Sequence, residues 1–168
     1  GSLMLSEEKG RALAKRVADK TKEIGAKLSF DVNFRKDIFR DFDAAKRAYE
    51  PFVKRADIVK FSEDELLDFT GISGIDAAAE SLCDKDKLIL VTLGKNGSAY
   101  YFNGEKGVVP SEYKCKSVDT TGAGDAFFGA FLAAIENKEP TKENIVSAMR
   151  KGNEKGAKTT EFFGAIKL

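Results

Sequence analysis

A run of polar and small residues, 119–125 (DTTGAGD), carries groups suited to phosphoryl transfer. It leads into a long apolar stretch that reads as a helix, so its backbone N–H groups lie at a helix N-terminus, where the macrodipole favours an anion. A carboxylate in the first turn can accept a proton from a hydroxyl that attacks phosphorus. We therefore predict a catalytic base at Asp125 and an anion hole made by Gly122, Ala123 and Gly124. The alternative is that Asp119 or Asp125 only complements the helix dipole.

The lack of histidine narrows the chemistry open to this chain. With no His among 168 residues, Ser-His-Asp and Cys-His triads are excluded and a zinc enzyme is disfavoured. A general base must then be a carboxylate, Lys, Tyr or Cys. The two cysteines, Cys83 and Cys115, form no disulfide framework and are interpreted as reduced thiols.

Composition and charge are those of an ordinary globular chain. A hydrophobic share of 42% and a charged share of 33% argue against disorder, and the length is enough for one α/β domain. The formal net charge of +1 gives no reason to expect nucleic acid or an anionic membrane as a partner. The sequence shows no membrane-span run and no signal peptide at its start, so we expect a cytoplasmic protein.

Helical and strand patterns alternate along the chain, which predicts an α/β fold with a mostly parallel sheet covered by helices. The predicted helices are 6–24, one from 43 that Pro51 interrupts, 63–69, 76–83, 123–136 and 142–158. Their N-caps are Ser6, Ser62, Asp76 and Thr141. The predicted strands are 28–32, 58–61, 88–93, 97–102 and 105–109, with 113–118 as a further candidate.

Two local patterns add detail to this layout. Asn103-Gly104 between two strands favours a β-hairpin with a type I′ turn. In the first helix, Leu13, Val17 and Ile24 share one face, as in an amphipathic helix.

Residues 119–132 (DTTGAGDAFFGAFL) resemble the C-terminal signature of the ribokinase-like (phosphofructokinase-B) family of carbohydrate kinases. The resemblance implies a three-layer α/β/α sandwich and transfer of the ATP γ-phosphate to a sugar hydroxyl with Mg²⁺ as cofactor. The runs DVNFR and DIVKFSEDEL resemble bacterial fructokinases most closely, which implies fructose as the acceptor. 2-Keto-3-deoxygluconate, or the acceptor of another ribokinase-family kinase, is the alternative.

Residues 87–97 (KLILVTLGKNG) resemble the strand and nucleotide-binding turn of this family. The resemblance implies that Thr92, Gly94 and Gly97 lie near ATP; an ordinary strand–turn–strand connection is the alternative. Asn153 corresponds to the place where relatives pack the adenine base, and the alternative for it is an exposed helix residue.

Two segments of the first half carry further candidates. Residues 31–35 (DVNFR) resemble a D-x-N-x-R segment of the family, which implies that Asn33 and Arg35 lie near the phosphates or substrate; a solvated loop is the alternative. Residues 62–65 (SEDE) resemble the family's N-x-x-E segment, with Ser62 in place of Asn, which implies that Glu65 orders magnesium through water. The alternative for Glu65 is a capping box with Ser62.

The resemblance also implies a monovalent cation, K⁺, bound by Asp119, Thr121 and carbonyl groups of residues 159–164. A carboxylate, a hydroxyl and carbonyls are suitable hard oxygen ligands. Family members differ in cation dependence, so this site stays an open expectation.

Family members are much longer than this chain. We therefore expect residues 1–168 to be the C-terminal ATP-binding and catalytic part of a sugar kinase, without the N-terminal sugar-binding and lid part, and to be inactive alone. The partners implied are a small-molecule sugar and ATP. A homodimer of the full-length protein stays open, because the lid often forms the dimer interface in this family.

Two other classes of protein are alternatives to a sugar kinase. Gly122-x-Gly124 with Gly129 could form a dinucleotide-binding loop, but a polar run precedes it instead of a buried strand, and Asp125 would repel a pyrophosphate. A non-catalytic sugar- or nucleotide-binding regulator is the alternative of a different class, and the complete Gly-Ala-Gly turn with Asp125 argues against it.

Overall fold

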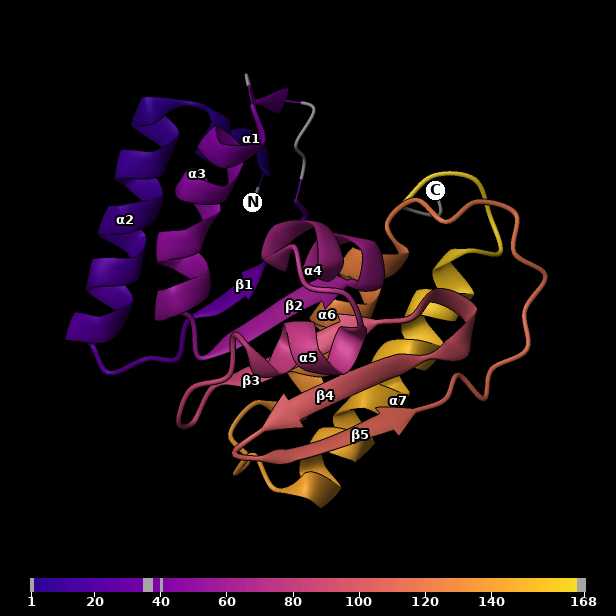
Figure 1. The fold of residues 1–168 in the computed structure, drawn as a ribbon. Helices are drawn as coiled ribbons and strands as arrows, with labels where there is room; N and C mark the ends of the chain where they lie inside the picture. Colours follow the sequence, from indigo (N-terminus) through magenta and orange to yellow (C-terminus); the bar gives the residue numbers. More distant parts are fainter. Residues whose placement is uncertain (1, 35–37, 40, 166–168) are drawn as a thin grey trace. The chain divides into compact units, whose positions relative to one another are not determined.

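The structure is a computed structural model that describes residues 2–34, 38–39 and 41–165 (Figure 1). The chain divides into two compact units. The first comprises Gly1–Val91 and Tyr101–Glu105, and the second comprises Thr92–Tyr100 and Lys106–Leu168. Residues 33 and 65 therefore belong to the first unit, whereas the run 119–125 belongs to the second.

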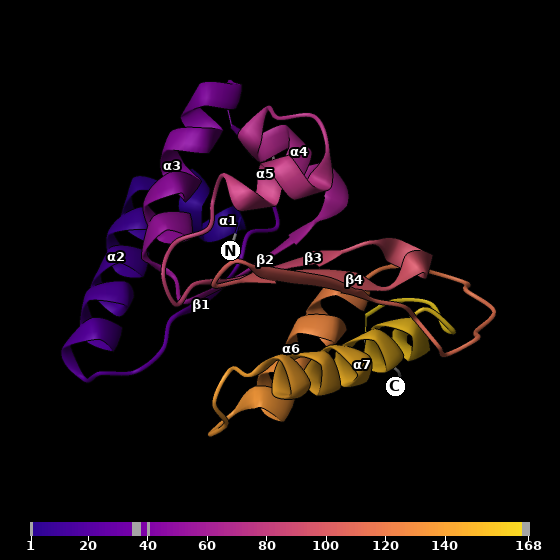
Figure 2. The ribbon, with the colours of Figure 1, turned by 60° about the horizontal axis from the view of Figure 1, so that its bottom comes forward.

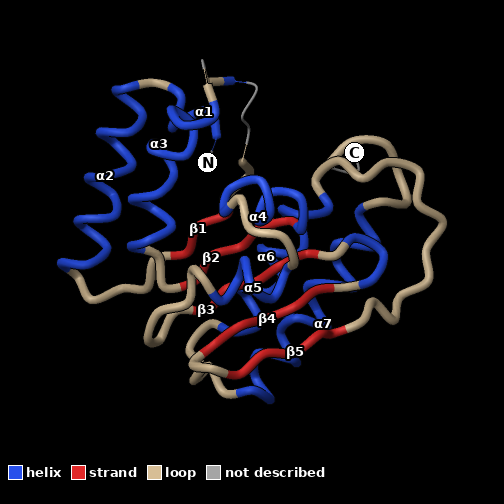
Figure 3. The backbone as a smooth tube through the Cα atoms, in the orientation of Figure 1, coloured by secondary structure: helices blue, strands red, loops and turns tan. Residues whose placement is uncertain are grey.

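Within the described residues, five strands form one sheet in the order β1-β2-β3-β4-β5 (Figure 3). β1 and β2 are parallel, and their register places Phe30 opposite Val59 and Asp31 opposite Lys60. All five predicted strands are confirmed, with ends that differ from the prediction by at most one residue. The strands are β1 (Ser29–Asp31), β2 (Ile58–Ser62), β3 (Leu88–Thr92), β4 (Ser98–Phe102) and β5 (Glu105–Val109).

Two strand predictions are confirmed in detail. Residues 88–91 of β3 are at most 2% exposed, as expected for an apolar run buried on both faces. Asn103 and Gly104, between β4 and β5, have φ angles of 48° and 80°. Positive φ at both central residues is the requirement of a type I′ turn, so Asn-Gly specifies this hairpin locally.

The helices of the first unit include the α2–α3 pair, which lies side by side in both ribbon views (Figure 2). Helix α4 begins and ends as predicted, because Ser62 forms a capping box with Glu65 and Gly71 closes the helix with a φ of 71°. These helices are α1 (Ser2–Ser6), α2 (Glu8–Glu23), α3 (Phe42–Arg55), α4 (Glu63–Thr70) and α5 (Ile75–Glu80).

The helix predicted over 6–24 is confirmed as α2 (Glu8–Glu23), whose ends differ from the prediction by one or two residues, and a short helix that was not predicted, α1, precedes it. Ser6 ends α1, and α2 begins after Glu7, which makes no side-chain cap. Arg11 donates from Nη1 to the carbonyls of Leu5 (2.8 Å) and Ser6 (3.0 Å), which satisfies acceptors at the end of α1. Ser6 was therefore wrong as the cap of this helix, because it is the last residue of α1 and the N-cap of α2 is Glu7.

The predicted interruption at Pro51 is also wrong. Helix α3 runs through Pro51 without a break, and Asp41 caps it by accepting from the N–H of Ala44 (2.6 Å). A proline inside a helix costs a hydrogen bond. Tyr49 and Phe52, on either side of Pro51, are 0% and 8% exposed, and their burial favours the continued helix.

Asp76 does not cap α5, whose N-cap is Gly74. The carboxylate of Asp76 instead accepts from the hydroxyl of Tyr101 (2.6 Å). Burial, and then this bond to a carboxylate, raises the pKa of Tyr101 well above its ordinary value. The side chain is engaged by tertiary structure, and α5 ends at Glu80, short of the predicted residue 83.

The shared face of Leu13, Val17 and Ile24 lies at the surface of this chain. The three side chains are 49%, 53% and 65% exposed, and Met4 in α1 is 46% exposed. The periodicity correctly placed these residues on one face of α2. It did not determine whether that face is covered.

The second unit contains η2 (Gly94–Asn96), α6 (Ala123–Ile135) and α7 (Lys142–Thr159), and the long α6 and α7 lie side by side (Figures 1 and 2). Thr141 caps α7 as predicted, through a bond from the N–H of Asn144. Residues 113–118 are all described and form no strand. The N–H groups of Val118 and Asp119 instead both donate to the carbonyl of Thr160, the C-cap residue of α7. No helix in the described parts is both long and apolar enough to cross a membrane.

Candidate active site

Gly122 forms the turn into α6. It is the N-cap residue, with φ 79° and ψ −1°, in the left-handed region that glycine adopts without strain. A Cβ at this position would lie 2.6 Å from Ala165 Cβ and 3.0 Å from Ala165 Cα. Backbone conformation and close contact with residue 165 therefore both require glycine here.

The first turn of α6 combines amide donors with a carboxylate. The N–H of Ala123, one of the predicted anion-hole residues, already donates to the carbonyl of Thr120 (3.2 Å). The N–H groups that follow in a first turn have no acceptor within the helix. Asp125 lies in this turn and is exposed. This helix end can therefore offer both an anion site and a proton acceptor.

Asp119 and Thr121 are brought together by the loop before α6. Asp119 Oδ1 accepts from the N–H (2.9 Å) and the hydroxyl (2.7 Å) of Thr121, and Oδ2 accepts from the N–H of Gly164 (2.9 Å). The Gly164 amide, followed by the two Thr121 donors, lowers the pKa of Asp119 below its ordinary value. The carboxylate is thus ionised at neutral pH and ties residues 119–121 to residue 164.

Thr92, Gly94 and Gly97 lie where β3 passes through η2 into β4. The N–H of Leu93 donates to the carbonyl of Gly97 (2.8 Å), which closes the turn. Gly97 has a φ of 100°, and a Cβ there would lie 2.2 Å from the Val109 carbonyl oxygen. Both the conformation of this tight turn and the close approach of Val109 therefore require glycine at position 97.

Asn153 is buried, at 8% exposure, so the alternative of an exposed helix residue is wrong. Its Oδ1 accepts from the hydroxyl of Ser98 (2.9 Å), and its Nδ2 donates to the carbonyls of Val109 (2.9 Å) and Pro110 (3.4 Å). Asn153 thus joins α7 to both ends of the β4–β5 hairpin. The loop that it holds lines a cavity of about 280 Å³, formed by Pro110, Glu112, Tyr113, Arg150, Lys151 and Glu154.

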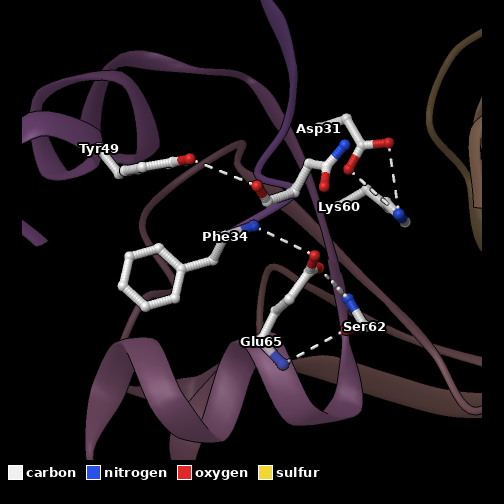
Figure 4. A network of polar contacts seen from close by, with 7 residues as sticks. Asp31, Phe34, Tyr49, Lys60, Ser62 and Glu65 are labelled. Atoms are coloured by element: carbon white, nitrogen blue, oxygen red, sulfur yellow. Dashed lines mark hydrogen bonds and ion pairs between the residues drawn. The ribbon is translucent and has the colours of Figure 1, made fainter. Parts of the chain in front are cut away.

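In the first unit, the segment after β1 is held by several contacts (Figure 4). Asn33 has a φ of 44°, and its carbonyl accepts from the hydroxyl of Tyr49 (3.3 Å). The next residue, Phe34, is 9% exposed and is therefore not part of a solvated loop. Arg35, predicted to contact phosphate or substrate, lies outside the described residues.

Glu65 forms the capping box expected as the alternative to its magnesium role, since its Oε2 accepts from the N–H of Ser62 (2.7 Å). It makes a second contact that the sequence did not predict. Oε1 accepts from the N–H of Phe34 (3.1 Å), 31 residues earlier in the chain (Figure 4). Glu65 therefore links two candidate segments of the first unit.

Lys60 is a buried polar residue of β2 that was not among the residues predicted from sequence. Its ammonium donates to both carboxylate oxygens of Asp31 (3.1 and 3.3 Å), and the residue is only 6% exposed (Figure 4). The signal was present, because a lysine inside the apolar strand IVKFS must find a partner if it is buried. The parallel register supplies Asp31 directly opposite.

Comparison with known proteins supports the fold class. The fructokinase from Vibrio cholerae O395, solved with fructose, ADP and a calcium ion, superposes with a TM-score of 0.90 at 31% identity, covering 98% of this chain and 54% of that one. A double mutant solved with fructose, ADP and a potassium ion gives 0.91 at 30% identity, with the same coverage. Aminoimidazole riboside kinase from Salmonella enterica, solved with aminoimidazole riboside and an ATP analogue, gives 0.87 at 28% identity, covering 98% and 56%.

The fold is therefore α/β of the ribokinase-like three-layer α/β/α class, as predicted. The family model for pfkB family carbohydrate kinases matches residues 4–167. Fructokinase-1 from Zea mays is 40% identical over 172 residues, covering 99% of this chain and 53% of the relative. The chain belongs to the pfkB family of carbohydrate kinases. It spans about half the length of the curated relatives it matches.

Proposed function

We propose that this chain supplies the ATP-binding and catalytic part of an ATP-dependent sugar kinase. The observation that carries the proposal is the start of α6, where Gly122 turns the chain and Asp125 follows in the first turn. Because the chain spans about half the length of its relatives, we expect most contacts with the sugar to come from outside these residues.

In this proposal Asp125 is the catalytic base. Its carboxylate removes the proton from the sugar hydroxyl as that oxygen bonds to the γ-phosphorus and the bond to the ADP oxygen breaks. Backbone N–H groups of Gly122, Ala123 and Gly124 stabilise charge on the transferred phosphoryl oxygens. Ala123 must release Thr120 to take part, because its N–H is engaged there (3.2 Å).

We assign the nucleotide to the second unit, near Thr92, Gly94 and Gly97. Asn153 supports this site indirectly in the described conformation, since its amide bonds to Ser98, Val109 and Pro110. It therefore shapes the wall of the site without needing to touch the base. The solved relatives hold ADP or an ATP analogue, which favours ATP as the phosphate donor.

Glu65 suits the expected magnesium ion, whereas Asp119 and Thr121 suit the expected monovalent cation. Each Glu65 carboxylate oxygen accepts a hydrogen bond from a backbone amide and keeps a lone pair for a magnesium-bound water. When bound, magnesium neutralises charge that develops on the phosphates. Asp119 and Thr121 offer a single carboxylate and a hydroxyl, a low negative charge that suits a monovalent ion such as K⁺.

Fructose is the proposed acceptor, because fructokinases are among the relatives by sequence and by structure. A ribokinase-family kinase with another acceptor, including 2-keto-3-deoxygluconate, is the second candidate. The likeness to aminoimidazole riboside kinase favours keeping it, because that enzyme shares the fold at similar identity. A panel of sugars in an ADP-release assay separates the two.

The test of the catalytic assignment is Asp125→Asn in the kinase that contains this sequence. We expect kcat to fall roughly 10²–10⁴-fold, the usual contribution of a general base, with little change in KM for ATP. The matched control is Glu143→Gln, since Glu143 also lies in the first turn of a helix, α7. If both variants keep wild-type kcat, Asp125 only complements the helix dipole and the assignment is wrong.

A further inference from the structure

Glu65 uses both of its carboxylate oxygens on backbone amides from separate segments. Oε2 accepts from Ser62 N–H (2.7 Å) at the start of α4, and Oε1 accepts from Phe34 N–H (3.1 Å) in the loop after β1 (Figure 4). The capping box explains only the first bond. The second fixes residue 34 against the N-terminus of α4.

The segment that contains Phe34 is held by two further hydrogen bonds, at residues 32 and 33. Val32 N–H donates to the carbonyl of Lys60 (3.0 Å), and the Tyr49 hydroxyl donates to the Asn33 carbonyl (3.3 Å). Between these bonds and the Glu65 contact, Asn33 takes a φ of 44°, a conformation that few residues other than Gly and Asn adopt readily.

The aromatic ring of Phe34 anchors the same point by packing. It meets the ring of Tyr49 edge-on at 5.1 Å between centroids, and the rings of Phe42 and Phe69 at 5.7 Å each. Phe69 belongs to α4, the helix that Glu65 begins. Side-chain packing and the carboxylate therefore fix Phe34 to the same helix, and Asn33 precedes this fixed point by one residue.

We propose that Glu65 is a positioning residue for Asn33. By binding the amides of Phe34 and Ser62 at once, its carboxylate sets the direction in which the loop leaves β1 and so the place of the Asn33 side chain. This inference rests on the proposed function together with the role near the phosphates or substrate that the family resemblance of DVNFR implies for Asn33. It is compatible with a water-mediated magnesium contact, because the two roles use different lone pairs.

The chemistry of the two amides makes glutamine a poor substitute for Glu65. A glutamine side chain has one acceptor oxygen and an NH₂ group that can only donate. It can keep one of the two bonds but must turn its NH₂ toward the other N–H. Glu65→Gln therefore cannot be silent, although glutamine is an accepted capping-box residue.

The direct test is hydrogen exchange of the Phe34 amide in the 168-residue chain without nucleotide or magnesium. In Glu65→Ala we expect exchange to accelerate roughly 10- to 100-fold, from the loss of a hydrogen bond to a charged group. Ser62→Ala removes the hydroxyl half of the capping box and leaves the carboxylate, so its Phe34 exchange should stay near wild type. Asp64→Asn, an exposed position in the same first turn, is the matched control.

Two exchange results would overturn the inference. One is wild-type protection of the Phe34 amide in Glu65→Ala, which would show that the contact does not hold the loop. The other is equal acceleration in Ser62→Ala, which would show that fraying of α4, and not the Glu65 carboxylate, controls residue 34.

The kinetics of the kinase that contains this sequence test whether the positioning of Asn33 by Glu65 affects turnover. We expect Glu65→Ala at saturating magnesium to keep a reduced kcat/KM for the sugar, and Tyr49→Phe to share that defect at roughly 2- to 10-fold, the worth of one neutral hydrogen bond. Full recovery of Glu65→Ala at high magnesium, with normal Tyr49→Phe, would leave only the magnesium role. Faster Phe34 exchange with unchanged turnover would instead overturn the part assigned to Asn33 and leave Asp125 unaffected.

Discussion

The packing of α6 against α7 predicts a change in stability for Gly152→Ala that is opposite in sign to the change expected from helix propensity alone. Glycine in a helix interior is less favourable than alanine by up to about 1 kcal/mol, so Gly152→Ala in α7 should stabilise an isolated helix. In the structure, a Cβ at Gly152 would lie 2.8 Å and 2.9 Å from two ring carbons of Phe127 and 3.0 Å from its carbonyl oxygen. The new methyl group has no space.

The size of the destabilisation depends on whether the groups around the new methyl group can move. Phe127 is 3% exposed and its ring stacks on Phe131 at 6.4 Å, so the ring is confined, and the carbonyl belongs to the backbone of α6. Overpacking of this kind costs about 1–3 kcal/mol. After subtracting the gain of about 1 kcal/mol in helix propensity, we expect Gly152→Ala to lower the free energy of unfolding by about 0–2 kcal/mol, instead of raising it.

Gly129 in α6 is the matched control, because it is exposed and a Cβ there would meet nothing within 4 Å. Gly129→Ala should raise the free energy of unfolding by about 0.5–1 kcal/mol. Urea unfolding at constant m-value measures both variants. A Gly152→Ala protein stabilised as much as Gly129→Ala would refute the close approach of the two helices.

Three further predictions concern other contacts. Gly164 and Thr121 lower the folded-state pKa of Asp119, so its ionised form stabilises the fold above its ordinary value of 3.8, and this contribution is lost as the pH falls through the lowered pKa. Asp119→Asn should therefore be less stable than wild type at neutral pH, and the difference between their urea midpoints should disappear below pH 3.8. An equal difference in urea midpoint at both pH values would contradict this expectation. Lys87 is 7% exposed, and its ammonium donates to two carbonyls at the end of α3 (2.9 and 2.8 Å). Lys87→Met should therefore lower the free energy of unfolding, measured with urea, by about 1–3 kcal/mol. An unchanged free energy of unfolding would show that water replaces the ammonium. Gly122→Ala should weaken ATP binding, measured by titration calorimetry, because the added Cβ would lie 2.6 Å from Ala165; wild-type affinity would show that the turn into α6 tolerates a side chain.

Some features of this protein were readable from short stretches of sequence. The capping box of Ser62 and Glu65, the stop at Gly71 and the Asn103-Gly104 turn depend on residues only a few positions apart. Their conformations follow from local sterics and local hydrogen bonds, which is why their positions could be predicted. The glycine turn before Asp125 belongs to this group, and the family prediction drawn from it is confirmed.

Other features depend on partners that are distant in sequence. Nothing near Glu65 indicates the amide of Phe34, 31 residues away, and nothing near Asn153 indicates Ser98, 55 residues away. The predicted strand at 113–118 failed for the same reason, since a strand needs a neighbouring strand to receive its hydrogen bonds.

The sequence by itself therefore determined the kinds of element, the helix caps Ser62 and Thr141, and the residue types that are able to carry chemistry. Only tertiary structure decided which glycines are required, which carboxylates are already engaged and which apolar face stays exposed. Gly152 shows the physical reason: its cost to an isolated helix is a local quantity, whereas its benefit is space for Phe127, which exists only once α6 packs against α7.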